Sequence, residues 1–124
     1  IEMKLLRFAD ILLIYAEAAN MAGSGPTQLA VDRVNLIIDR ANEGTGTEAR
    51  ATLAMTQAQF DQKVIDERSF ELCFENDRYF DVLRKKLLQQ VNLPDNADGY
   101  DENDYLLPIP ALDAMSIGQN PGYE

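Results

Sequence analysis

The residues best equipped for chemistry are the acids and arginines between positions 67 and 81. Two neighbouring carboxylates, such as Glu71 and Glu75, are the arrangement that glycosidases use to cleave glycosidic bonds. On a helix the charged side chains of this segment share an arc of roughly 140°: Glu67, Arg68, Glu71, Glu75, Arg78 and Asp81. Helical spacing permits the pairs Arg68–Glu71, Glu75–Arg78 and Arg78–Asp81. Because each acid has a cation within reach, ion pairs are favoured over a hydrolytic pair, and we expect no catalytic residue.

A second set of charges interrupts the apolar segment at positions 3–21. Arg7, Asp10 and Glu17 follow one another at helical spacing, so they share one face of the predicted helix. The rest of that segment is rich in Ala and Leu. We therefore expect its charged face to form partly buried ion pairs with the charged arc at 67–81. The predicted structural ion-pair network comprises Arg7, Asp10, Glu17, Glu67, Arg68, Glu71, Glu75, Arg78 and Asp81.

Several other chemistries are excluded by composition. The chain has no histidine, which removes histidine-based triads, histidine-bearing zinc sites and haem held by a proximal histidine. The single cysteine, Cys73, cannot form an internal disulfide, and no histidine exists to activate it as a nucleophile. Since Cys73 has apolar neighbours, we expect it to be a small buried side chain. We expect no cofactor and no metal site.

The net charge narrows the possible partners. The chain of 124 residues carries 21 acidic against 11 basic side chains, a formal charge of −10. Nucleic acid and anionic lipid would be repelled, whereas neutral sugars or peptides are not excluded. The most apolar run, residues 11–16, is flanked by charges too closely for a membrane span of about 20 residues. The sequence shows no signal peptide and begins at Ile1, so we expect a fragment of a larger protein.

Periodicity and capping signals predict three helical regions. The first covers about 3–21 and stops at a Gly-Ser-Gly-Pro run; the second covers about 28–41, with Thr27 or Ser24 as its N-cap. The third covers about 57–88, with a capping box at Thr56 and a break or bend near Asn76. The first two span about one tetratricopeptide period. The predicted fold is mostly α: a tetratricopeptide-like helical hairpin plus a long helix, with an irregular, loop-rich tail at 92–124.

The tail begins with an acidic loop at 92–104. Its acids do not follow the spacing of a calcium-binding EF-hand loop, which favours a solvated loop and leaves calcium binding open. Tyr100 and Tyr105 are weak candidates for stacking on a sugar ring, and packing on their own domain is the more ordinary role for loop tyrosines. The ligand-binding residues are otherwise unknown.

Four segments of the chain, in order, resemble the C-terminal region of the SusD/RagB family. LRFADILLIYAEA at 6–18 is similar to the family's LRYADVLLMYAEA, and VNLIIDRA at 34–41 to its N-x-[IV]-R-x-R-A. ERSFELCFENDRYFDVLR at 67–84 resembles ERRxELxFEGxRWFDLxR, and LPIP at 107–110 followed by QNPGY at 119–123 resembles YPIP…QNPGY. The departures include Ile38 for arginine, Asn42 and Asn76 for glycine, and Tyr79 for tryptophan.

The resemblance implies a function as well as a fold. Members of this family are α-rich lipoproteins on the cell surface of Bacteroidetes-type outer membranes. They bind glycans or other nutrients and pass them to a TonB-dependent SusC-like porin, with a lipid anchor that would lie outside this chain. Residues 1–124 would then form a single C-terminal region that serves mainly as scaffold. The alternative is a free-standing helical-repeat module for protein–protein interaction.

Overall fold

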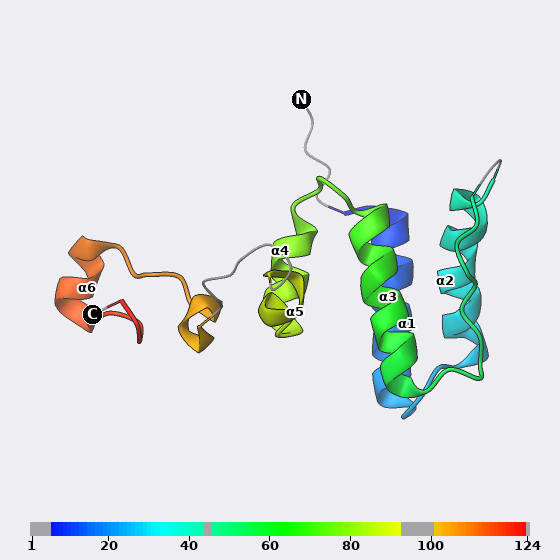
Figure 1. Ribbon diagram of the computed structural model, residues 1–124, viewed down its shortest axis with the longest axis horizontal. Coiled ribbons are helices and arrows are strands. Elements are labelled where there is room, and N and C mark those ends of the chain that lie inside the picture. The colour runs from blue at the N-terminus through cyan, green and yellow to red at the C-terminus, as the bar shows by residue number, and fades with distance from the viewer. Residues whose placement is uncertain (1–5, 44–45, 93–100, 124) are drawn as a thin grey trace. The chain divides into compact units, whose positions relative to one another are not determined.

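The computed structural model describes residues 6–43, 46–92 and 101–123, and within these ranges the regular structure is helical, without strands. The mostly α fold predicted from the sequence is confirmed (Figure 1). The chain divides into two compact units, Ile1–Arg78 and Tyr79–Glu124. Each unit is described below by itself.

Three helices form the first unit: α1 (Phe8–Ala22), α2 (Gln28–Ala41) and α3 (Gln57–Glu71). Helix α1 packs against both α2 and α3, while α2 and α3 contact each other more sparsely (Figure 1). The core consists of apolar side chains that recur every three or four positions along these helices, so each helix buries one stripe. Its fully buried large apolar members are Leu13, Val34, Ile38, Phe60 and Val64.

The second and third helices start where their capping signals predict. The first helix starts later than predicted. The Thr27 side chain accepts a 3.2 Å hydrogen bond from the Ala30 N–H, and Thr56 forms a reciprocal capping box with Gln59. The prediction that the first helix extends back to about residue 3 is wrong for Arg7, which is extended at φ −119° and ψ 159°. Extended backbone lets the Arg7 side chain reach across to α3, so α1 begins at Phe8.

The predicted third helix at 57–88 is divided into α3, α4 (Asp77–Arg84) and the start of α5 (Leu88–Asn92). The first break lies near Asn76, as the sequence allowed, where Phe74 and Asn76 have φ of 64° and 71°. A second break, which the sequence did not predict, coincides with Lys86 at φ 54°. A residue in the left-handed region cannot continue a right-handed helix, so each break ends the run of hydrogen bonds.

The tail is less irregular than predicted. It contains the 3₁₀ helix η1 (Glu102–Tyr105) and α6 (Ala111–Ile117). Helix α6 begins directly after Pro110, whose fixed φ suits the residue that precedes a helix, and ends at Gly118 with φ 83°. Residues 93–100, which include Asp95 and Asp98 of the acidic loop, lie outside the described ranges.

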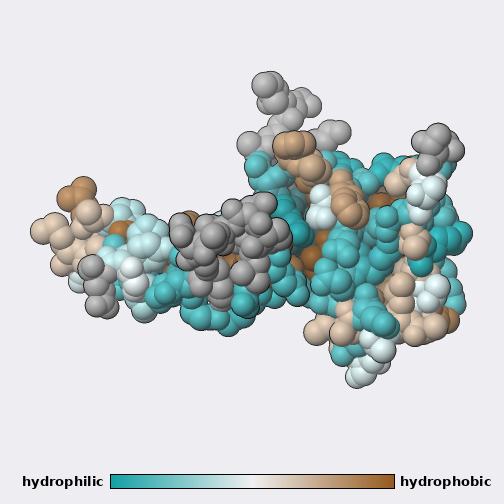
Figure 2. All heavy atoms as spheres, in the orientation of Figure 1, coloured by the Kyte–Doolittle hydropathy of each residue, from teal (hydrophilic) through white to brown (hydrophobic). Residues whose placement is uncertain are grey.

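Apolar side chains also lie on the surface of the first unit, on the side of α1 that faces away from the core. Phe8 is 69% exposed, and Ile11, Ile14, Tyr15 and Met21 are exposed by 41–57%. Figure 2 shows hydrophobic residues at the surface among mostly hydrophilic ones. Along the described residues, no helix combines the length and the apolar character that crossing a membrane requires.

The expectation of a buried Cys73 is wrong, because its side chain is exposed. It lies between α3 and α4, where the backbone leaves the helical path. Its neighbour Phe74 is 100% exposed. Leu72 on the other side is buried, so the apolar residues around Cys73 do not form one buried helical face.

Candidate functional site

The guanidinium of Arg7 joins the start of α1 to the end of α3. Its Nη1 donates to Glu71 Oε1 at 2.8 Å, its Nε to Glu75 Oε2 at 2.7 Å, and its Nη2 to the Glu71 carbonyl at 2.5 Å. Arg40 of α2 also pairs with Glu71. The hydrogen bonds with Glu75 and then Glu71 raise the pKa of Arg7 above its ordinary value. Both carboxylates therefore pair with Arg7, and Glu71, through its second partner Arg40, links α3 to α2 as well.

A second ion pair lies deeper between the same two helices. Arg68 Nη1 of α3 donates to Asp10 Oδ1 of α1 at 2.6 Å, and the side chains are only 7% and 9% exposed. A short, charge-assisted hydrogen bond between buried partners fixes the relative positions of two helices, because breaking it would strand a buried charge.

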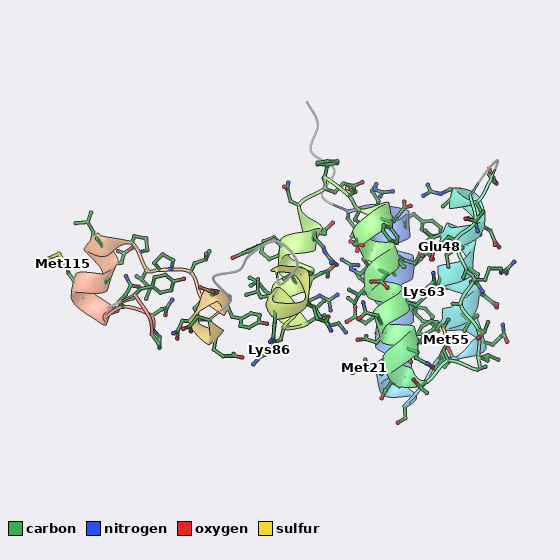
Figure 3. All side chains as sticks on the ribbon, viewed as in Figure 1. Met21, Glu48, Met55, Lys63, Lys86 and Met115 are labelled. Carbon is green, nitrogen blue, oxygen red and sulfur yellow. The ribbon has the colours of Figure 1, made fainter. Side chains whose placement is uncertain are left out.

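A third group surrounds Lys63 on α3. Its ammonium contacts Glu48, on the connection between α2 and α3, and lies 3.2 Å from Glu67 Oε1 one turn further along α3 (Figure 3). Burial raises the pKa of Glu67, although Lys63 opposes this effect. For Lys63, burial lowers the pKa, but the hydrogen bonds to Glu48 and Glu67 outweigh it and leave the pKa raised. Sequence reasoning missed Lys63, although its spacing of four residues from Glu67 was a usable signal.

The remaining members of the predicted network lie as follows. Asp81 is buried on α4 and accepts from Arg84 Nη2 at 2.7 Å, a partner three residues on that the sequence analysis did not name. Arg78 on α4 and Glu17 on α1 are half-buried. These contacts centre on Arg7, Arg68, Lys63 and Asp81. That all nine predicted residues form one network stays a prediction.

Of the two tyrosine candidates, Tyr100 lies outside the described residues. Tyr105 is half-buried in η1, and the Lys86 ammonium lies 5.8 Å from the centroid of its ring. A cation at this distance interacts with one of the two faces of the ring. Asp101 and Asp104 cap η1 through 2.8 Å hydrogen bonds with backbone N–H groups. Over the described residues, no group of three or more His, Cys, Asp or Glu side chains could hold a metal ion.

An open pocket of about 350 Å³ lies between α1 and α2. Five apolar residues line it, namely Phe8, Ala9, Leu12, Leu36 and Ile37. Three charged residues also line it, namely Asp39, Arg40 and Glu43. Sequence reasoning did not find this pocket. The available signal was that Phe8 and Leu36 are large apolar residues off the buried stripes of their helices. The pocket can accept an apolar group.

Known proteins resemble this chain across nearly its whole length. SusD-like protein P2 of Formosa agariphila is 35% identical over an alignment 128 residues long, which covers 95% of this chain and 25% of that protein. A SusD homologue from Bacteroides thetaiotaomicron superposes with a TM-score of 0.77 at 28% identity, over 95% of this chain and 26% of that one. A SusD superfamily protein from Parabacteroides distasonis gives a TM-score of 0.69 at 31% identity, over 97% and 27%.

The chain therefore spans about a quarter of the length of these relatives. The two solved structures share its helical, tetratricopeptide-like fold. The sequence profile of the SusD family matches residues 1–123. The resemblance first seen in four short segments thus holds over the whole region, and the chain belongs to the SusD family.

Proposed function

We propose that this chain is part of a cell-surface lipoprotein of the outer membrane that binds a nutrient, most simply a glycan, and passes it to a TonB-dependent SusC-like porin. The observation that carries the proposal is the family match over residues 1–123. Within the larger protein, this region acts mainly as scaffold. The larger protein binds the nutrient without converting it chemically, and the lipid anchor lies elsewhere in the polypeptide.

The contacts of the charged motif residues support the scaffold role. Glu71 and Glu75 both accept hydrogen bonds from Arg7, and Asp10 accepts from Arg68. These side chains hold helices together and leave their carboxylates engaged with arginines. A glycosidase needs instead one carboxyl group that donates a proton and a second that attacks or activates water.

The scaffold and hydrolase roles predict different outcomes for Glu71→Gln and Glu75→Gln in the full-length protein. As scaffold, Glu71→Gln lowers the free energy of unfolding by about 2–4 kcal/mol, since the Glu71 side chain is only 9% exposed and pairs with two arginines. Glu75→Gln has a smaller effect, about 1 kcal/mol, because Glu75 is more exposed. Neither variant changes the affinity for neutral malto-, xylo- or laminari-oligosaccharides, measured by calorimetry. Hydrolysis products from the wild type that disappear in either variant would contradict the scaffold role.

The nutrient-binding role is tested on the same full-length protein. We expect one class of those oligosaccharides to bind, with no cleavage detected by chromatography, and a SusC-like porin to co-purify from outer membranes. Absence of binding across neutral and acidic oligosaccharides and peptides, together with absence of a porin partner, would contradict the proposal.

The exposed apolar side of α1 bears on the alternative, a free-standing helical-repeat module. Such a module requires a polar outer face on its terminal helix, yet Phe8, Ile11 and Ile14 are exposed there. We propose that further polypeptide covers this side in the whole protein. The isolated chain should therefore aggregate or melt without cooperativity in circular dichroism and light scattering. A monodisperse monomer with a cooperative melt would favour the module instead.

A further inference from the structure

Two asparagines, Asn35 within α2 and Asn42 at its C-cap, each form two hydrogen bonds to one residue of the connection that leads to α3. Asn42 Nδ2 donates to the Glu48 carbonyl at 2.9 Å, and Asn42 Oδ1 accepts from the Glu48 N–H at 2.9 Å. Asn35 makes the same pair of bonds to Ala51, at 3.0 Å and 2.8 Å. We call residues 46–55 the strap; it runs back along α2 (Figure 1).

The spacing of the two asparagines matches an extended chain. They are seven positions apart, which along an α-helix is a rise of about 10.5 Å. The two gripped residues, Glu48 and Ala51, are three positions apart, which in an extended chain is about 10 Å. A carboxamide supplies one acceptor and one type of donor, which satisfy both backbone groups of a single residue. The two side chains therefore form a ladder that recognises main chain without regard to side chains.

The first residue of the strap, Gly46, lies against Asn42 of the same ladder. A Cβ added to Gly46 would lie 2.5 Å from Asn42 Cα and 2.6 Å from Asn42 Oδ1, so only glycine can pass this close. Thr47, Ala49 and Arg50 are exposed, whereas Ala51 is 3% exposed and belongs to the core. The strap thus presents its backbone to α2 and most of its side chains to the surface.

We propose that Asn35 and Asn42 form a binding site for extended main chain on α2, occupied by the chain's own strap. The strap is held closed by this ladder and by the contact between Glu48 and Lys63. It closes over the Ala51 side of the core, and it opens locally, as one segment, when a rung of the ladder is lost. Residues 49 and 50, which lie between the rungs, accept substitution, while Gly46 and the two asparagines do not.

Limited trypsin digestion tests the proposal, because Arg50 is 61% exposed and lies between the two rungs. Cleavage requires the strap to leave α2, so the wild type is cut slowly there. Asn42→Asp keeps the acceptor for the Glu48 N–H but places a second oxygen against the Glu48 carbonyl. We expect Asn42→Asp and Asn35→Asp each to accelerate cleavage after Arg50 roughly tenfold, as the loss of a hydrogen bond and a new repulsion imply.

Matched controls separate strap opening from general unfolding. Gln28→Ala changes an exposed carboxamide on the same helix, which bonds Asp32, and should leave cleavage after Arg50 unchanged. Amide exchange at Val34, in the buried face of α2, should stay slow in Asn42→Asp while exchange at Glu48 and Ala51 accelerates. Equal cleavage rates in Asn42→Asp, Asn35→Asp and Gln28→Ala, or equal acceleration at Val34, would overturn the proposal.

Discussion

Arg68 and Asp10 are 58 positions apart in the sequence, yet a 2.6 Å hydrogen bond joins them and both side chains are buried. This pair connects α3 to α1 inside the three-helix unit. Removing one partner leaves the other charge buried, so we expect Asp10→Ala to lower the free energy of unfolding by about 3–5 kcal/mol. Urea denaturation followed by circular dichroism, in a full-length protein that contains this region, measures the change.

Two variants sharpen this prediction. Asp39→Ala removes an exposed partner of Arg50, 3.2 Å away, and should cost less than about 1 kcal/mol. Replacing both members of the buried pair, as Asp10→Leu with Arg68→Met, should restore most of the stability because the two buried charges are removed together. If Asp10→Ala costs no more than Asp39→Ala, the buried pair does not hold the helices together.

Glu67 should make stability depend on pH. Burial raises its pKa above the ordinary 4.5 despite the opposing effect of Lys63, so between 4.5 and the raised value the folded state binds more protons than the unfolded state. The contribution of Glu67 is therefore present below about pH 4.5 and is lost as pH rises through the raised pKa. We expect the stability of wild type relative to Glu67→Gln to fall as pH rises across this window.

Urea denaturation of both proteins at a series of pH values measures this difference. Lys63→Met removes the cation that opposes burial, so it should raise the folded-state pKa of Glu67 further and extend the upper end of the window of pH dependence. A wild-type advantage over Glu67→Gln that grows with pH would contradict the prediction, because it would mean that the ion pair with Lys63 outweighs the effect of burial.

Asn76 sets the break between α3 and α4. Its φ of 71° lies in the left-handed region, which glycine and asparagine enter most readily. Asn76→Gly should leave the free energy of unfolding unchanged or raise it by up to about 1 kcal/mol, and Asn76→Val should lower it by about 1–2 kcal/mol. Ala58→Val, at an exposed helical position of α3, controls for the branched side chain and should cost about 0.5 kcal/mol. Equal losses in the two valine variants would contradict the assigned backbone strain.

The Gln119 side chain binds both backbone groups of one residue in the tail, as the Asn35 side chain does in the strap. Its Oε1 accepts from the Ile109 N–H at 2.6 Å, and its Nε2 donates to the Ile109 carbonyl at 2.8 Å. Gln119→Glu replaces that donor with an oxygen that repels the carbonyl, which should destabilise the local fold by about 1–3 kcal/mol. Amide exchange at Ile109, followed by NMR or mass spectrometry, should accelerate by one to two orders of magnitude. Gln90→Glu, exposed on α5, should not change it; equal effects would show that Gln119 does not fasten the tail.

The sequence predicts helices well where the signals are local. Thr27 and Thr56 cap the starts of α2 and α3 through residues three positions on, and such contacts are visible in a short window. The break near Asn76 was also expected, because asparagine tolerates a left-handed backbone. Lys86 carries no such signal, and a left-handed lysine arises only where the surrounding chain requires it.

The charged residues show the limit of the same reasoning. Helical spacing favoured partners within one helix, such as Arg68 with Glu71, because short sequence separations are the ones a wheel can display. The structure pairs Arg68 with Asp10 and Glu71 with Arg7 and Arg40, across distances of 31–64 positions. Lys63 and Arg84, which complete two of the ion pairs, were not named, although both lie within one turn of their partners.

The sequence alone determined the helical class, the family and the residue types available for ion pairs, since periodicity, motif order and composition are properties of the chain itself. Only the tertiary structure decided which charges meet, where the strap lies on α2, and that Cys73 is exposed. The physical reason is that these features depend on contacts between segments distant in sequence. Many such pairings satisfy the same local pattern, and the packing of α1 against α2 and α3 selects one of them.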